Sequence, residues 1–210
     1  MTMRLPISRL TLGSSLRAYQ RTPPTSLDQA KGFDRSAALA IVHATQRTYT
    51  RAVRPVPLKI VTVSKNNSQG AEIMAGEWLE KLQRYAEASE VVIRPNPKNA
   101  ADPKVAVQAE GERVLKMLRP QDRVVVLDER GKEATSEKIA EMIAAAGDDG
   151  VGALVFCIGG PHGHSSEVRK RADSMLRLSA CVLNHQVARV VLLEQLYRGW
   201  TILKGEPYHH

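Results

Sequence analysis

The feature that most constrains this chain is a regular alternation, from residue 57 onward, between short β-branched apolar runs and longer amphipathic segments. The apolar runs lie at 58–63, 91–93, 124–127 and 153–158. The amphipathic segments repeat apolar residues every three to four positions and lie at 74–85, 107–118 and 139–146. The runs predict strands, and the segments predict helices. Because the two alternate, we expect an α/β fold in which a parallel sheet carries helices on both faces. The unbroken apolar run at 124–127 predicts a strand that is covered on both sides.

The last segment, 185–202, breaks the alternation because apolar residues occupy most of its circumference. Arg189, Glu194 and Arg198 interrupt it, and the chain has no run of eighteen apolar residues. We therefore expect no membrane span. The segment predicts a helix that packs on protein. Because one subunit would leave part of this helix uncovered, a second copy of the chain is the expected partner.

The net charge of +8 is concentrated in the first 55 residues. This segment has nine of the 30 basic residues and two of the 22 acidic ones, and it is rich in arginine, serine and threonine. Such a composition is typical of an organelle transit peptide. A basic arm that helps to bind RNA is the alternative. We therefore divide the chain into a leader, 1–55, and one folded domain, 56–210, whose own charge is nearly balanced.

Composition and absent motifs argue against several classes of protein. Two cysteines, Cys157 and Cys181, without a CxxC pair argue against a disulfide scaffold or a structural zinc site. The nucleotide-binding patterns GxGxxG and GxxxxGK[ST] and the hydrolase patterns GxSxG and HExxH are missing. Aromatic residues, at 4%, are too few for a sheet that stacks RNA bases. His162 and His164 have no third ligand nearby, so we interpret them as solvent-exposed loop residues and expect no metal.

The pair Gly159-Gly160 directly follows the apolar run at 153–158. Ligands of open parallel sheets bind beyond the carboxyl ends of the strands, where glycine lets a ligand approach the backbone. The pair is therefore a candidate binding site. An ordinary strand-to-helix turn explains two glycines equally well.

A series of motifs in the second half of the chain resembles one known family. The series comprises Phe156-Cys157-Ile158-Gly159-Gly160-Pro161-His162-Gly163, Leu178-Ser179, Leu183-Asn184-His185-Gln186, Leu193-Glu194-Gln195-Leu196-Tyr197-Arg198 and Pro207-Tyr208-His209. In order and spacing it is similar to the bacterial ribosomal large-subunit methyltransferase H family. That family modifies N3 of a pseudouridine in 23S rRNA and belongs to the SPOUT superfamily of knotted methyltransferases. The resemblance covers residues 57–210 and is strongest from Leu127 onward.

The resemblance implies a C-terminal trefoil knot whose loops bind S-adenosylmethionine in a bent shape. The matching positions are Leu127, Gly159, Gly160, Ser179, Ala180, Cys181, Val182, Leu183 and Asn184. A bare backbone at Gly160 would let adenosine approach, and Leu127, Val182 and Leu183 would form apolar walls around the adenine. Backbone N–H and C=O groups of the loop 179–184 would bind the adenine edge. For Leu127 and Leu183, plain core packing is the alternative.

The resemblance also implies a two-fold homodimer formed through the last helix, in which the tail of one subunit completes the site of the other. Tyr208 and His209 are then the candidate catalytic residues. Methylation of N3 requires the loss of its proton, which a neutral imidazole or a phenolate could accept. The roles of base and orienting group stay open between the two residues. The alternative is a frayed tail without a function.

Four basic residues would place positive charge near the pocket, either as the RNA contact surface or as a solvated helix face: Arg169, Lys170, Arg171 and Arg177. The family has arginine directly after the Tyr-His pair, whereas this chain has His210, so the RNA contact of that position is in doubt. Asn184 also stands where the family usually has proline.

The expected function is therefore a methyltransferase that uses S-adenosylmethionine to modify N3 of a uridine or pseudouridine in organellar large-subunit rRNA. The basic leader favours an organellar form of the family, with the plastid stroma of a plant ahead of the mitochondrion. Two alternatives remain: a catalytically silent ribosome assembly factor, which the His210 substitution motivates, and a knotted methyltransferase of another RNA such as tRNA.

Overall fold

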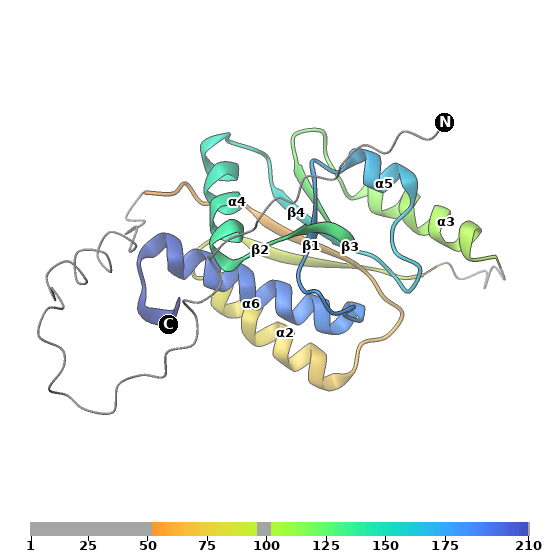
Figure 1. Cartoon of the computed structure of the whole chain (residues 1–210), viewed down its shortest axis with the longest axis horizontal. Helices are drawn as coiled ribbons and strands as arrows, with labels where there is room; N and C mark the ends of the chain where they lie inside the picture. Colours follow the sequence, from red (N-terminus) through yellow and green to blue (C-terminus); the bar gives the residue numbers. More distant parts are fainter. Residues whose placement is uncertain (1–51, 96–101, 210) are drawn as a thin grey trace, which may run out of the picture. The chain divides into compact units, whose positions relative to one another are not determined.

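The computed structural model describes residues 52–95 and 102–209 of the chain. Its centre is a five-stranded sheet in the order β2-β1-β4-β3-β5, and every neighbouring pair of strands is parallel (Figure 1). The strands are β1 (Leu58–Val63), β2 (Ala88–Ile93), β3 (Arg123–Glu133), β4 (Leu154–Ile158) and β5 (Ser174–Arg177). The expected parallel α/β sheet is confirmed.

Helices cover both faces of the sheet, as the alternating pattern predicts. They are α2 (Gln69–Leu82), α3 (Pro103–Lys116), α4 (Ser136–Asp148), α5 (Ser166–Arg171), α6 (His185–Lys204) and a terminal 3-10 turn, η2 (Pro207–His209). One face carries α2, α4 and α6 side by side, and the other carries α3 and α5 (Figure 1). Within the described residues, no helix is long and apolar enough to cross a membrane.

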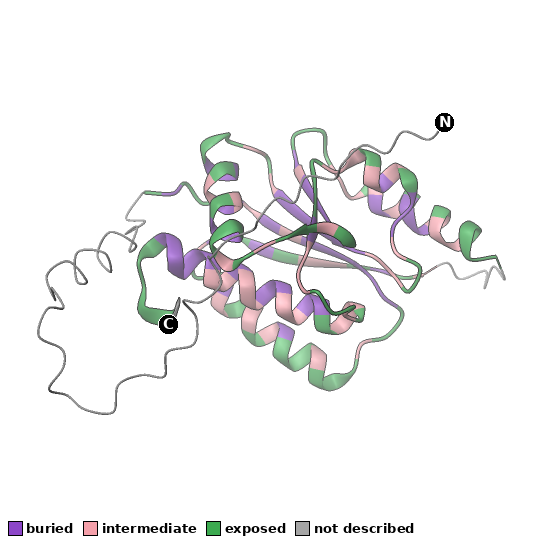
Figure 2. Ribbon diagram, viewed as in Figure 1, coloured by how far each residue is buried: buried purple, intermediate pink, exposed green. Residues whose placement is uncertain are grey.

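Each central strand divides its side chains between two apolar cores, because successive residues of a strand point to opposite faces. In β4, Phe156 packs toward α2, α4 and α6, whereas Cys157 packs toward α3 and α5. All five residues of β4 are buried, and so are 124–126 of β3 (Figure 2). The fully buried Trp200 of α6 is the largest side chain of the first core. The core also contains Val53, which is 7% exposed and precedes the expected start of the domain.

Two elements were not expected from the sequence, α5 and β5. Both are short and polar, and Leu176 is the one buried residue of β5.

Strand β3 is also longer than the apolar run 124–127. Leu127 and Lys132 both pair with Leu176, so residues 128–131 bulge out of the sheet. Gly131 permits this arrangement, because a Cβ there would lie 2.6 Å from the backbone of Leu176.

Helix α6 begins and ends with standard caps. The side chain of Asn184 accepts hydrogen bonds from the backbone N–H groups of Gln186 and Val187, both at 3.0 Å. Gly205 ends the helix in the left-handed conformation with φ of 68°. Asn184 in place of the family's usual proline is thus the residue that starts α6. The trefoil knot that the resemblance implies stays a prediction.

Candidate active site at the carboxyl ends of β3 and β4

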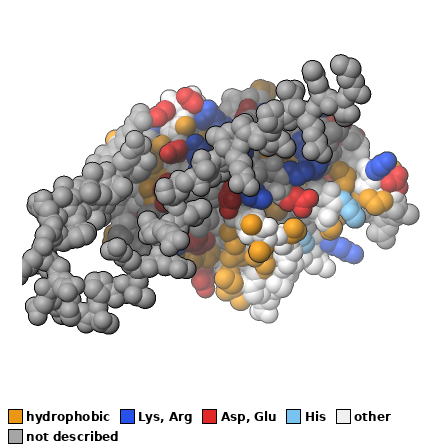
Figure 3. All heavy atoms as spheres, in the orientation of Figure 1, with side chains coloured by type: hydrophobic (Ala, Val, Ile, Leu, Met, Phe, Trp, Pro, Cys, Tyr) orange, Lys and Arg blue, Asp and Glu red, His pale blue; other side chains and the backbone are white. Residues whose placement is uncertain are grey.

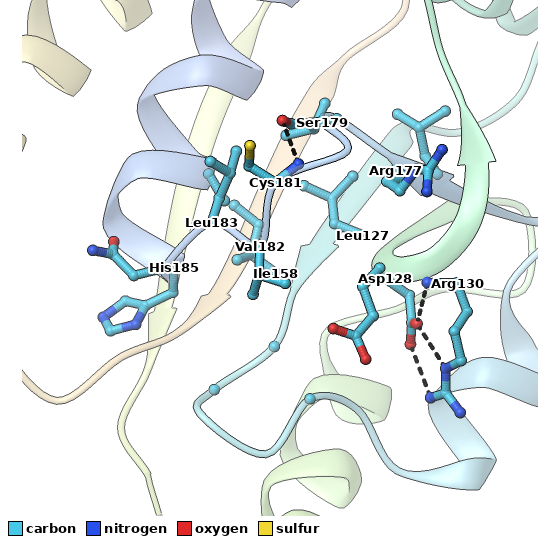
Figure 4. A pocket seen from close by; sticks show the side chains of 18 of the residues that line it. Leu127, Asp128, Arg130, Ile158, Arg177, Ser179, Cys181, Val182, Leu183 and His185 are labelled. Atoms are coloured by element: carbon cyan, nitrogen blue, oxygen red, sulfur yellow. Dashed lines mark hydrogen bonds and ion pairs between the residues drawn. The ribbon is translucent and has the colours of Figure 1, made fainter.

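A cavity of about 780 Å³ lies beyond the carboxyl ends of β3 and β4, where ligands of parallel sheets usually bind. Three segments that are distant in the sequence form its walls: 127–130 at the end of β3, 158–163 after β4, and 176–185 between β5 and α6. Figure 4 shows side chains of these segments around the cavity. The last segment connects the cavity directly to α6.

The structure brings all nine predicted cofactor-binding residues together on the walls of this one cavity. They are Leu127, Gly159, Gly160, Ser179, Ala180, Cys181, Val182, Leu183 and Asn184. Leu127 and Leu183 also pack against the first core, so core packing and cavity lining both apply to them. Val182 is 81% exposed, so its apolar side chain is open to contact by a ligand in the cavity.

The loop after β5 leaves its backbone polar groups available to a ligand. The N–H of Cys181 donates a hydrogen bond to Ser179 Oγ at 3.0 Å (Figure 4). Within the described part of the chain, residues 179–183 make no other backbone hydrogen bond. Since backbone N–H and C=O groups need partners when a ligand covers them, this loop can bind the polar edge of a planar base.

The two glycines of the β4 loop are required by close contacts within the fold itself. A Cβ at Gly160 would lie 3.3 Å from both Val63 Cγ1 and Glu110 Oε2, and a Cβ at Gly159 would lie 2.8 Å from the backbone of Gly163. The glycines therefore allow the loop to fold back on itself and against the sheet, and this folding shapes the cavity. Gly160 also lines the cavity, and the approach of the adenosine to its bare backbone stays a prediction.

The interpretation of both histidines as solvent-exposed is wrong for His164. Its side chain is buried, and its Nε2 lies 3.1 Å from the carbonyl oxygen of Cys157. Burial lowers the pKa of His164, so the imidazole stays neutral near pH 7. His162 is exposed at the rim of the cavity. No group of three or more metal-ligating side chains occurs among the residues that the structure describes.

Asp128 organises the β3 side of the cavity. Its side chain is 5% exposed and accepts a hydrogen bond from Arg130 Nε at 3.1 Å (Figure 4). It also accepts a hydrogen bond from Arg169 Nε at 3.0 Å. Burial favours the neutral acid, but the hydrogen bonds from Arg130 and Arg169 outweigh it and lower the pKa of Asp128 to about 2. The carboxylate is therefore charged at neutral pH and fixes both guanidinium groups at the cavity rim.

The four basic residues that we expected to contact RNA do not form one patch. Arg169 and Arg177 line the cavity, and Lys170 is exposed. Arg171 instead donates hydrogen bonds to the carbonyl oxygens of Arg119 and Asp122, both at 2.9 Å, near the amino end of β3. That end of the sheet is opposite the cavity, so Arg171 has a structural role in the loop before β3.

Among the cavity residues that sequence reasoning missed, three are polar and take part in hydrogen bonds: Asp128, Arg130 and His185. A signal for Asp128 was available, because it directly follows the apolar run 124–127, as Gly159 follows the apolar run 153–158. Arg130 could not be assigned without the bulge that turns it back to Asp128. His185 belongs to the motif Leu183-Asn184-His185-Gln186, but nothing in the sequence shows that its side chain contacts Ser64.

The tail lies on α6, away from the cavity of its own chain. The Tyr208 ring packs edge-on against Tyr197 at 5.0 Å between centroids, and the Arg198 guanidinium lies 4.8 Å from its centroid. The Tyr208 hydroxyl donates to Glu194 Oε1 at 3.2 Å. Burial and the Glu194 carboxylate raise the pKa of Tyr208. The ring is thus a neutral phenol at pH 7 in this position, and the phenolate that we considered as a base is disfavoured.

The backbone of His209 belongs to η2. The side chain of His209 and all of His210 lie outside the described residues, and so does the leader up to residue 51. The expectations for these residues stay predictions.

Comparison with known proteins matches residues 56–209 to a family described as "Predicted SPOUT methyltransferase". The chain is 48% identical over 160 residues to "Putative RNA methyltransferase At5g10620" of Arabidopsis thaliana, covering 76% of this chain and 83% of that protein. It is 41% identical over 155 residues to "Ribosomal RNA large subunit methyltransferase H" of Christiangramia forsetii, covering 73% of this chain and 98% of that protein.

Among solved structures, a probable methyltransferase from Bordetella pertussis Tohama I aligns with a TM-score of 0.45 and 15% identity, covering 77% of this chain and 99% of that chain. The sequence matches, which extend over almost the whole described domain, decide the family. The enzyme class that the motifs implied is confirmed: the chain belongs to the SPOUT methyltransferase family.

Proposed function

We propose that this protein uses S-adenosylmethionine to methylate N3 of a uridine or pseudouridine in organellar large-subunit rRNA. The observation that carries the proposal is the convergence of all nine expected cofactor residues on one cavity. A relative of 41% identity, named for the large-subunit rRNA, supports the choice of substrate.

The cavity offers the groups that the proposed cofactor needs. Leu127, Val182 and Leu183 provide apolar surface for the adenine ring, and the loop 179–183 provides backbone donors and acceptors for its edge. The cofactor supplies an activated methyl group on a sulfonium, so the protein has to bind it, orient it and place the acceptor nitrogen.

The reaction is an in-line attack of N3 on the methyl carbon. N3 must lose its proton before or during the attack, because its lone pair forms the new bond. Placing nitrogen and methyl group at attack distance contributes much of the remaining acceleration. Arg130 and Arg169, which Asp128 holds at the rim, carry the positive charge that a phosphate of the RNA backbone would contact.

We propose further that the enzyme is a homodimer in which the tail completes the partner's cavity. Tyr208 docks beside Glu194, nine residues after His185, which places it about 14 Å along the helix from the cavity end of α6. This distance from its own cavity supports a role of the tail in the cavity of another subunit, where Tyr208 as a phenol donor and His209 would orient the target base. The exposed apolar side chains Ile73 and Met74 lie on α2, beside α6, where hydrophobic side chains gather in Figure 3, and they provide a surface for the partner.

The plastid stroma is the proposed location, with the mitochondrion as second choice. The basic leader, poor in acidic residues, has the composition of a transit peptide. A relative of 48% identity comes from a plant, which supports a plant organelle.

The test uses the purified full chain with radiolabelled S-adenosylmethionine and two transcripts of large-subunit rRNA, one made with uridine and one made with pseudouridine. The proposal predicts label in at least one transcript and, after digestion, an N3-methylated uridine or pseudouridine by mass spectrometry. A control transcript in which the labelled position is replaced by cytidine should take up no label. Cofactor binding without transfer to any rRNA would contradict the proposed substrate, and absence of cofactor binding would favour a silent assembly factor.

A further inference from the structure

A chain of hydrogen bonds connects the cavity to a charged cluster on the neighbouring helices. His185, the first residue of α6, lies on the cavity wall across from Asp128 (Figure 4). Its Nε2 atom is 3.1 Å from Oγ of Ser64, which follows β1 and is 2% exposed. Ser64 Oγ lies 2.8 Å from Oδ1 of Asn67. The Nδ2 group of Asn67 donates in turn to Glu72 on α2.

The direction of these hydrogen bonds is fixed from the carboxylate end. An ionised carboxylate can only accept, so Asn67 must present its Nδ2 donor to Glu72 and its Oδ1 acceptor to Ser64. The Ser64 hydroxyl therefore donates its hydrogen bond to Oδ1 of Asn67. Ser64 Oγ is then the acceptor for a proton on Nε2 of His185. The neutral imidazole is thereby held in one tautomer, with Nδ1 as its unprotonated nitrogen.

Glu72 is itself held in the charged state. The hydrogen bond from Asn67 and the contacts with Arg189 lower the pKa of Glu72 below its ordinary value. The Arg189 side chain is 6% exposed, lies 3.1 Å from Glu72 Oε2 through Nη2, and pairs with Glu90 at 2.6 Å through Nε. A buried guanidinium between two carboxylates gives the chain of hydrogen bonds a rigid end.

From this geometry we infer that His185 accepts the N3 proton of the target base. Nδ1 of His185 has no hydrogen-bond partner among the described residues, and His185 is one of the residues that line the cavity. In the proposed step the N3–H proton moves to Nδ1, and the N3 lone pair forms the bond to the methyl carbon. The carbon–sulfur bond breaks, and its electron pair stays on sulfur, which becomes a neutral thioether. The imidazolium then returns its proton to water.

This inference rests on the proposed function and assigns one of its steps to a residue of the same chain. The chain of Ser64, Asn67 and Glu72 stabilises the imidazolium as it forms, because a negative charge stands at its far end. The partner's tail is then left with the orientation of the base. Ser64, Asn67 and Glu72 are positioning residues, since they act through His185.

The decisive variant is His185→Asn, with turnover measured against pH on the rRNA transcript. A general base contributes about 10²- to 10⁴-fold, so we expect kcat to fall by that factor at pH 7 while KM for the cofactor stays within about twofold. The deficit should shrink at alkaline pH, because the imide N3–H then ionises without a base. Ser64→Ala should lower kcat by about tenfold, the value of one lost hydrogen bond.

The charged groups packed around this chain of hydrogen bonds are Glu72, Glu90 and Arg189, and Asp128 and Arg130 lie across the cavity.

The matched control is Ser136→Ala, which removes a serine hydrogen bond of 2.7 Å to Gln195 away from the cavity and should leave kcat unchanged. Circular dichroism and cofactor titration establish that each variant is folded and binds. An active wild type with an equally active His185→Asn variant would refute the inference and leave the proposed function standing. A loss that is independent of pH would refute it too, because that pattern indicates a structural role. An inactive wild type would instead contradict the proposed function.

Discussion

Replacing Asp128 by asparagine tests whether this carboxylate organises the cavity rim. The ionised side chain is 5% exposed and contacts two guanidinium groups at 3.0 and 3.1 Å. Its pKa is lowered from 3.8 to about 2, and one pKa unit corresponds to about 1.4 kcal/mol. Arg130 is 65% exposed, so solvent screens its share of the interaction. We therefore expect Asp128→Asn to lower the free energy of unfolding by about 1–2 kcal/mol at pH 7.

The effect must depend on pH in a defined direction. A carboxyl whose pKa is lowered in the folded state stabilises the fold above its unfolded pKa, here near 4, and loses that contribution as the pH falls toward 2. Urea unfolding followed by circular dichroism at pH 7, 5 and 3, at one protein concentration, measures the difference between wild type and variant. The difference should be similar at pH 7 and 5 and fall to about half at pH 3.

Asp149→Asn is the matched control, because Asp149 also pairs with an arginine, Arg123, at 2.5 Å, but its side chain is 58% exposed. A surface pair of this kind contributes about 0–1 kcal/mol. Equal losses in the two variants, or an Asp128→Asn loss that is the same at pH 7 and pH 3, would refute the reasoning.

Three further predictions test the loop, the core and the tail. Gly159→Ala should weaken cofactor binding at least tenfold by calorimetry, because its Cβ would lie 2.8 Å from the backbone of Gly163 and displace the cavity loop; unchanged affinity would contradict this. Trp200→Ala should cost about 3–5 kcal/mol in urea unfolding, since the side chain is fully buried, and a loss below 1 kcal/mol would show that the core collapses around it. Deleting 207–210 should abolish methyl transfer and leave cofactor affinity and the dimer intact; loss of folding would show a structural tail instead.

The sequence predicted the sheet because its central strands are buried on both faces. The run 124–127 and the strand Leu154–Ile158 are almost entirely apolar, and such continuous apolar runs are typical of parallel strands that helices cover on both faces. Strand β5 was not predicted, because Ser174 and Met175 are exposed and Leu176 is its one buried residue. A single buried position in four residues produces no alternating apolar pattern. It is held by pairing with β3, which no local signal encodes.

The candidate site was predicted in part, for a reason of the same kind. The cofactor loop followed from motifs in the chain, and those residues do share one cavity. The interactions of Asp128 with Arg169 and of His185 with Ser64 join residues 41 and 121 positions apart, respectively. Such contacts follow from the order of the strands in the sheet, so the spacing of residues could not reveal them. The burial of His164 escaped prediction for a different reason: its Nε2 lies 3.1 Å from the carbonyl oxygen of Cys157, only 7 residues earlier, because the loop after β4 folds back on itself.

Subunit complementation tests the central claim most directly. One subunit carries Leu127→Arg, which places a long charged side chain in the cavity, and the other lacks residues 207–210. Each variant alone should be inactive. If the tail of one subunit completes the cavity of the other, random mixing yields half mixed dimers with one complete site each, and activity returns to about a quarter of wild type. A mixture that forms mixed dimers but stays inactive would contradict the account.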